Sequence, residues 1–195
     1  MTPERTEKLQ NVLSKRQADF TLVLENVFDP HNISAVMRTC ESVGIQDIFV
    51  LNTKIPQHKK FGEKSSSSAT KWLTINQYDN AAECFNELHK RNFRIYTTWL
   101  GEGSLDLYEM NFTEPLAIVF GNEKTGVSDE IRALADGNMV IPQVGIIQSL
   151  NISVACAVTV YEAFRQKRLA AHYDTQRLPL KRYDELWKLW SENRD

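Results

Sequence analysis

The chain has 195 residues, of which 42% are hydrophobic and 10% aromatic, and its formal net charge is −2. This composition supports one domain with a full core and disfavours a disordered chain. No stretch approaches the roughly 18 to 20 apolar residues that span a bilayer, and the N-terminus lacks the apolar centre of a signal peptide, so we expect a cytoplasmic protein without membrane contact.

The spacing of apolar residues predicts helices and strands that alternate along the chain. The N-terminal half is expected to contain a helix at 3–17, a strand at 21–27, a helix at 33–43 that ends at Gly44, and a strand at 48–51. A strand, a helix and a second strand in this order are typical of a parallel sheet.

The second half continues the same pattern. After a loop at 53–70, Asp79 is expected to cap a helix, and Ser128 to begin another. The expected elements are helices at 81–90 and 151–169 and strands at 93–99, 116–120 and 139–141. Together they predict an α/β fold with a mostly parallel sheet flanked by helices.

The tail carries apolar residues at helical spacing, namely Tyr183, Leu186, Trp187 and Trp190. Packing of this stripe on its own domain is the default expectation, and a partner subunit or RNA bases are alternatives. The cysteines Cys40, Cys84 and Cys156 have no Cys-x-x-Cys spacing, so neither a disulfide framework nor a zinc site is indicated and buried thiols are expected.

Basic residues gather in three places despite the acidic net charge. They lie in the N-terminal helix, in segment 54–71 and in segment 161–182. Together they fit a surface that faces phosphates, but any one cluster is more often a solvated face. Charge alone therefore leaves nucleic-acid binding open.

Ligands of an α/β sheet bind beyond the carboxyl ends of its strands. The first segment expected there runs from Pro30 to Cys40, in which Asn32 can cap the helix and Arg38 follows six residues later, well around the helix. Ordinary capping by Asn32, and pairing of Arg38 with a carboxylate, are the alternatives to a functional role.

Two further segments follow later strands. Segment 120–128 is a turn flanked by Gly121 and Gly126, and it lacks the Gly-Lys-Ser/Thr ending of a nucleotide-binding loop. Segment 141–155 leads from a strand into a helix whose first backbone N–H groups lack partners, so its small polar residues fit an anion or another ligand.

In order and spacing, these three segments resemble the signature motifs of the SPOUT RNA methyltransferases. The match is closest to the TrmH group of the SpoU branch, the tRNA guanosine 2′-O-methyltransferases, and it extends from Lys15 to Lys167. The resemblance implies a C-terminal part threaded into a deep trefoil knot, which sequence rules alone would reject. It also implies a homodimer and S-adenosylmethionine as cofactor, with S-adenosylhomocysteine as product and no metal.

The resemblance also implies roles for particular residues. Arg38 would lie near the RNA phosphate with Ser149 and Asn151, while Asn32 and Glu123 shape the cofactor site and its loops. Arg38 would activate the ribose hydroxyl, either as a base or by stabilising negative charge, and the second role asks less of a side chain that is always protonated. The implied cofactor contacts are Thr98, Gly121, Ile141, Ile146 and Leu150, and the implied RNA contacts are Lys8, Arg16, His31, Arg165 and Lys167.

The implied activity is methylation of a ribose 2′-hydroxyl in tRNA, most specifically the D-loop guanosine at position eighteen. Alternatives are ribosomal RNA or another tRNA ribose as substrate, and a non-catalytic RNA-binding protein on the same fold. The short flanks favour tRNA. The expected organisation is a helical extension at 1–19, a methyltransferase domain at 20–170 and a second helical extension at 171–195.

Overall fold

The computed structural model describes residues 1–58, 69–101, 103–147 and 149–192. Most of the predicted loop at 53–70, with Lys59, Lys60 and Lys64, lies outside the described residues. Among the described residues, no helix is long and apolar enough to cross a membrane.

The described residues form one sheet of seven strands in the order β3-β2-β1-β6-β4-β7-β5, and neighbouring strands are parallel. The predicted parallel α/β fold is therefore confirmed. The strands are β1 (Phe20–Glu25), β2 (Asp47–Leu51), β3 (Thr74–Tyr78), β4 (Arg94–Thr98), β5 (Leu105–Asp106), β6 (Leu116–Phe120) and β7 (Gly137–Val140).

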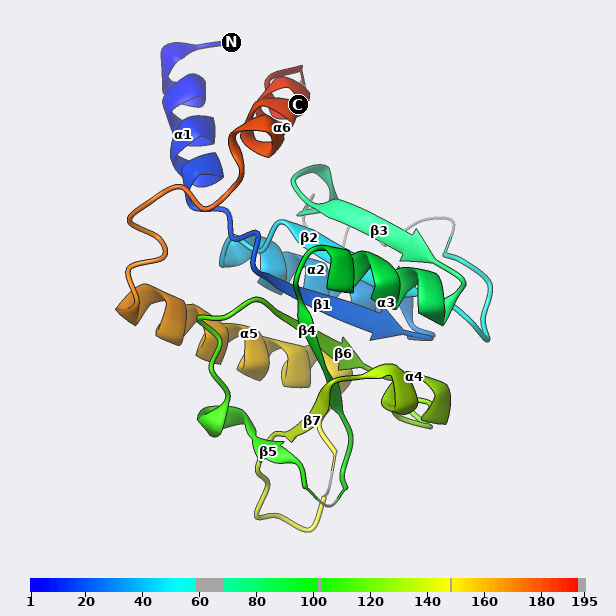
Figure 1. Ribbon diagram of the computed structural model, residues 1–195. Helices are drawn as coiled ribbons and strands as arrows, with labels where there is room; N and C mark the ends of the chain where they lie inside the picture. The colour runs from blue at the N-terminus through cyan, green and yellow to red at the C-terminus, as the bar shows by residue number, and fades with distance from the viewer. Residues whose placement is uncertain (59–68, 102, 148, 193–195) are drawn as a thin grey trace.

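Helices cover both faces of the sheet (Figure 1). On one face lie α2 (Pro30–Ser42) and α5 (Ile152–Leu169), and on the other lie α3 (Ala81–Lys90) and α4 (Asp129–Leu134). The central strand β1 is buried along its whole length, with Leu22 and Leu24 in one core cluster and Val23 in the other. Burial on both faces explains why β1 reads as a nearly continuous apolar run.

The helices α1 (Pro3–Ser14) and α6 (Leu180–Glu192) pack together at one end of the molecule (Figure 1). Trp190 is only 1% exposed, and its ring meets the edge of Trp72 at a centroid distance of 5.3 Å. The default expectation for the tail, packing on its own chain, is confirmed. The division at residues 19/20 and 170/171 stays a prediction.

The first turn of α2 corrects the expected capping residue. The helix begins at Pro30, and Asp29 is its N-cap, because the Asp29 side chain accepts a hydrogen bond from the His31 N–H at 2.8 Å. Proline suits the first helical position because that N–H would have no partner in the helix. Asn32 therefore lies inside the helix, and its side chain is available for other contacts.

The predictions for the other helix ends are confirmed only in part. Asn80, one residue after the expected Asp79, caps α3 by accepting from the Glu83 N–H at 3.0 Å. Gly44 follows the last turn of α2 with a φ of +84°, as expected for a glycine that ends a helix. Ser128 precedes α4 as predicted.

Two strands and two short turns were not predicted. The edge strand β3 is half-buried and largely polar, and β5 is two residues long, so neither carries an apolar run that reveals a strand. The 3₁₀ turns are η1 (Ala69–Lys71) and η2 (Leu107–Glu109).

The three cysteines are buried and free, as predicted. Burial raises the pKa of the Cys84 thiol to about 12, with a smaller contribution from Glu87. The pKa values of Cys40 and Cys156 are also raised, first by burial. Thiols in such surroundings stay protonated and unreactive.

Candidate functional site

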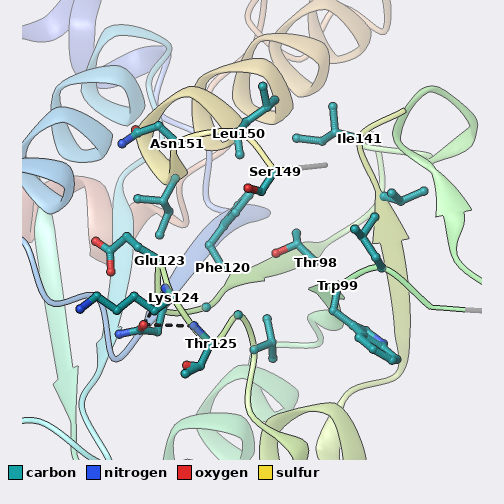
Figure 2. A pocket seen from close by; sticks show the side chains of 18 of the residues that line it. Thr98, Trp99, Phe120, Glu123, Lys124, Thr125, Ile141, Ser149, Leu150 and Asn151 are labelled. Atoms are coloured by element: carbon teal, nitrogen blue, oxygen red, sulfur yellow. Dashed lines mark hydrogen bonds between the residues drawn. The ribbon is translucent and has the colours of Figure 1, made fainter. Parts of the chain in front are cut away.

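A cavity of about 750 Å³ lies beyond the carboxyl ends of β4, β6 and β7. Its wall comes from the segments that follow these strands, and Figure 2 shows Thr98 and Trp99 facing residues Glu123 to Thr125 and Ser149 to Asn151 across it. The described residues therefore bring the second and third predicted segments to one site.

The turn after β6 is held closed by hydrogen bonds within its own backbone. Asn122 and Gly126 exchange two backbone hydrogen bonds of 3.1 and 2.9 Å, and the Asn122 side chain accepts from the Lys124 N–H at 2.9 Å. A Cβ at Gly121 would lie 2.2 Å from backbone atoms of Gly126 and Val127. Only glycine leaves room for this close approach, and both Gly121 and Gly126 line the cavity.

Hydrogen bonds join all three predicted segments at the rim of the cavity. The Asn32 amide donates to Glu123 Oε1 at 2.9 Å and accepts from the Asn151 amide at 3.3 Å. Asn151 is also the N-cap of α5, because its Oδ1 accepts from the Ser153 N–H at 2.9 Å. The interior helical position of Asn32 thus allows a chain of contacts from Glu123 to Asn151.

Four of the five expected cofactor contacts line the cavity: Thr98, Gly121, Ile141 and Leu150. The fifth, Ile146, is 100% exposed and is not among the residues that line the cavity, so its contact with the cofactor stays a prediction. Its neighbours are exposed as well, over residues 142–147. Ser149, Asn151 and Glu123 also line the cavity.

Arg38 lies on the exposed side of α2. Within the part of the chain that the structure describes, its side chain makes no hydrogen bond or ion pair, so no carboxylate of that part is its partner. The structure does not bring Arg38 into hydrogen-bond contact with Asn32 or Asn151. It remains a cation available for a ligand.

Two of the five expected RNA contacts are wrong, because their charged groups are buried in the chain. Arg16 is fully buried, donates to Glu41 Oε1 at 3.0 Å and lies 4.9 Å from the centroid of the Trp190 ring. Lys167 is 1% exposed and binds Asp19 Oδ1 at 2.7 Å; burial lowers the pKa of Lys167, and Asp19 opposes this shift.

The other three expected RNA contacts are accessible. Lys8 and His31 are exposed, and the Arg165 side chain is 59% exposed although it pairs with Glu162. These contacts remain a prediction.

Two residues of the site were not predicted from the sequence. Asn138 in β7 accepts from the Trp99 N–H at 3.0 Å and donates to the Trp99 carbonyl at 2.6 Å, so it fixes the loop after β4. The Trp99 ring lies 4.1 Å from the Arg132 guanidinium and lines the cavity. The only sign of Asn138 in the sequence is that a polar residue stands within a short strand.

Among the described residues, no group of three His, Cys, Asp or Glu side chains lies close enough to hold a metal ion.

Known proteins resemble this chain over the residues that form the site. The profile of the SpoU rRNA Methylase family matches residues 19–161. A tRNA (guanosine(18)-2'-O)-methyltransferase of Thermus thermophilus is 42% identical over 191 residues, which are 97% of this chain and 96% of the relative.

Two solved structures of related enzymes are also similar to this chain. A TrmH/SpoU tRNA modifying enzyme of A. aeolicus has a TM-score of 0.89 and 34% identity, with 98% of each chain covered. The SpoU methyltransferase AviRb of Streptomyces viridochromogenes in complex with the cofactor AdoMet has a TM-score of 0.71 and 25% identity, over 81% of this chain and 64% of that protein. This likeness implies the knotted SPOUT fold that the motifs predicted.

Proposed function

Because the chain belongs to the SpoU rRNA methylase family, we propose that it transfers a methyl group from S-adenosylmethionine to the ribose 2′-hydroxyl of the guanosine at position 18 of tRNA. The observation that carries the proposal is the cavity whose rim joins Glu123, Asn32 and Asn151. Similarity over nearly the whole chain to a tRNA enzyme favours tRNA over ribosomal RNA as substrate.

The cavity residues fit the proposed cofactor. The turn that holds Gly121 and Gly126 lines the cavity and is too tight for a Cβ at Gly121, and Ile141, Leu150 and Thr98 add apolar surface and a hydroxyl. A cavity of about 750 Å³ is within the range of cofactor sites. When bound there, S-adenosylmethionine supplies an electrophilic methyl group on its sulfonium sulfur.

The protein's own groups act on the RNA. Arg38 stabilises negative charge that develops on the 2′-oxygen as the hydroxyl proton passes to water, because a guanidinium stays protonated and a fixed positive charge lowers the energy of that state. Ser149 and Asn151 hold the neighbouring phosphate. Asn32 and Glu123 are positioning residues that keep the turn after β6 beside α5.

The proposal includes a homodimer. Apolar side chains remain exposed after β7 and along α5, including Ile147 at 75%, Val154 at 47% and Tyr161 at 53%. Val154 and Tyr161 are seven residues apart and lie on the same side of α5. A second copy of the chain would remove this surface from water. A tRNA substrate also implies a cytoplasmic location.

The proposed function is tested with unmodified tRNA transcripts and labelled S-adenosylmethionine, followed by mapping of the methyl group. We expect a ribose 2′-O-methyl at guanosine 18. A methyl on a base, or on ribosomal RNA in preference to tRNA, contradicts the proposal. Cofactor binding without transfer to any RNA would support the alternative of a non-catalytic RNA-binding protein.

Gly121→Ala is expected to weaken the binding of S-adenosylhomocysteine by about 10- to 100-fold, the cost of overpacking a close contact. The reason is that the added Cβ meets backbone atoms of Gly126 and Val127, which have no side-chain freedom to move away. Isothermal titration calorimetry measures the affinity. Gly145→Ala is the matched control, because a Cβ at Gly145 meets nothing within 4 Å, and it should keep the original affinity.

A further inference from the structure

A second cavity of about 400 Å³ lies beside the first. The two cavities share Asn122, Glu123 and Lys124 as a common wall. A ligand in the second cavity would therefore touch the same turn as a ligand in the first. The remaining wall comes from the loop between β1 and α2, with Phe28, Asp29 and Asn32.

Phe28 presents its ring to solvent from a loop that is held in place. The residue is 74% exposed, whereas the preceding Val27 is 1% exposed. The Phe28 N–H donates to Glu123 Oε2 at 3.3 Å, the Val27 carbonyl lies 2.9 Å from a His58 ring nitrogen, and the Asn122 amide donates to the Asn26 carbonyl at 2.7 Å. An exposed aromatic ring on a fixed backbone is preorganised for stacking.

The polar groups of this cavity favour a ligand that donates hydrogen bonds. Asp29 uses Oδ1 to accept from the His31 N–H at 2.8 Å, and its Oδ2 has no partner among the described residues. Glu123 accepts one bond at each carboxylate oxygen and has capacity for more. The carboxylates of Asp29 and Glu123 outnumber the single cation, Lys124, so the lining has a net negative charge that disfavours a phosphate. Adjacent N–H groups of a planar ring suit the two carboxylates.

We propose that the cavity lined by Phe28, Asp29 and Lys124 is the subsite that reads the target base, and that it selects guanine; this rests on the proposed function. The guanine ring stacks on Phe28, while its N1–H and N2 amino group donate to the Asp29 carboxylate. Unstacked RNA bases are commonly bound in this way, by aromatic stacking and hydrogen bonds on the Watson–Crick edge.

The proposed contacts account for discrimination between bases. A carboxylate takes two parallel N–H bonds from guanine, but adenine presents a ring nitrogen that is itself an acceptor, and inosine lacks the N2 amino group. A good bidentate pair discriminates by about 1–3 kcal/mol, which corresponds to about 5- to 150-fold. The cavity is therefore predicted to prefer guanosine over inosine and adenosine at the methylated position.

The test uses Asp29→Asn, because asparagine caps a helix as well as aspartate and keeps an acceptor for the His31 N–H. We measure kcat/KM for tRNA transcripts with guanosine or inosine at the target position. The original protein should prefer guanosine, and Asp29→Asn should reduce that preference about tenfold. Phe28→Ala should lower kcat/KM about tenfold for both transcripts, because stacking is shared by both bases.

Asp106 and Tyr108 provide matched controls, because Asp106 Oδ1 accepts from the Tyr108 N–H at the same 2.8 Å and Tyr108 is 60% exposed. Neither residue lines a cavity described above. Asp106→Asn and Tyr108→Ala should leave both the kcat/KM and the guanosine preference unchanged.

The outcomes separate the inference from the proposed function. If the original protein methylates tRNA guanosine and Asp29→Asn retains the full preference over inosine, the subsite is wrong and the proposed function stands. If the original protein methylates no tRNA guanosine, both are overturned. Unchanged affinity of Asp29→Asn for S-adenosylhomocysteine, with a reduced guanosine preference, supports the subsite.

Discussion

Arg38→Ala is expected to lower kcat for ribose methylation by about 100- to 1,000-fold, the usual cost of removing one group that stabilises charge in a transition state. The fold should be unaffected, because Arg38 is exposed and makes no hydrogen bond or ion pair within the described part of the chain. Single-turnover methylation of a tRNA transcript measures the rate. The thermal midpoint and the affinity for S-adenosylhomocysteine show whether folding and cofactor binding are retained.

Two control variants sharpen this experiment. Arg38→Lys keeps the positive charge but loses the planar fork of the guanidinium, so partial activity is expected if charge stabilisation is the main role. Arg94 is exposed at the first residue of β4, at the amino end of the strand, whereas the cavity lies beyond the carboxyl end, and Arg94→Ala should keep full activity. Near-normal transfer by a folded, cofactor-binding Arg38→Ala protein would falsify both roles considered for Arg38.

Trp190→Ala is expected to lower the free energy of unfolding by about 3–5 kcal/mol, the usual cost of truncating a buried tryptophan. Trp190 is among the largest fully buried side chains, and it packs against Trp72 and against the guanidinium of Arg16. Its loss would leave a cavity and remove the ring that covers a buried cation. Urea unfolding followed by circular dichroism measures the change.

Leu189 is a suitable control, because it lies beside Trp190 in α6 and is 54% exposed. Leu189→Ala should change the free energy of unfolding by less than about 0.5 kcal/mol, as for most surface substitutions. A similarly small change for Trp190→Ala would show that α6 is not packed on α1 as the structure has it.

Much of the fold followed from local sequence. The buried strand β1 and the termination of α2 at Gly44 depend on apolar runs and on a residue that tolerates positive φ, and both signals are visible within a few residues. The strand β3 did not follow, because an edge strand with polar residues has no such signal.

The candidate site was predicted in part. Gly121, Thr98 and Leu150 line the cavity as the motifs implied, whereas Ile146 lies outside it. Asn138 was missed because its role is a hydrogen bond to the loop after β4. Its partner, the Trp99 N–H, is 39 residues away in the sequence. A contact over that separation has no periodic pattern in the sequence.

The sequence by itself determined the succession of helices and strands and the family to which the three motifs belong, because these depend on residue type and short spacing. Only the tertiary structure decided which basic residues are available to RNA. Arg16 and Lys167 looked like surface cations, but both are buried and each is paired with a distant carboxylate. Arg16 binds Glu41, 25 positions away, and Lys167 binds Asp19, 148 positions away. Burial of a charge depends on partners distant in the chain, and folding alone brings those partners together.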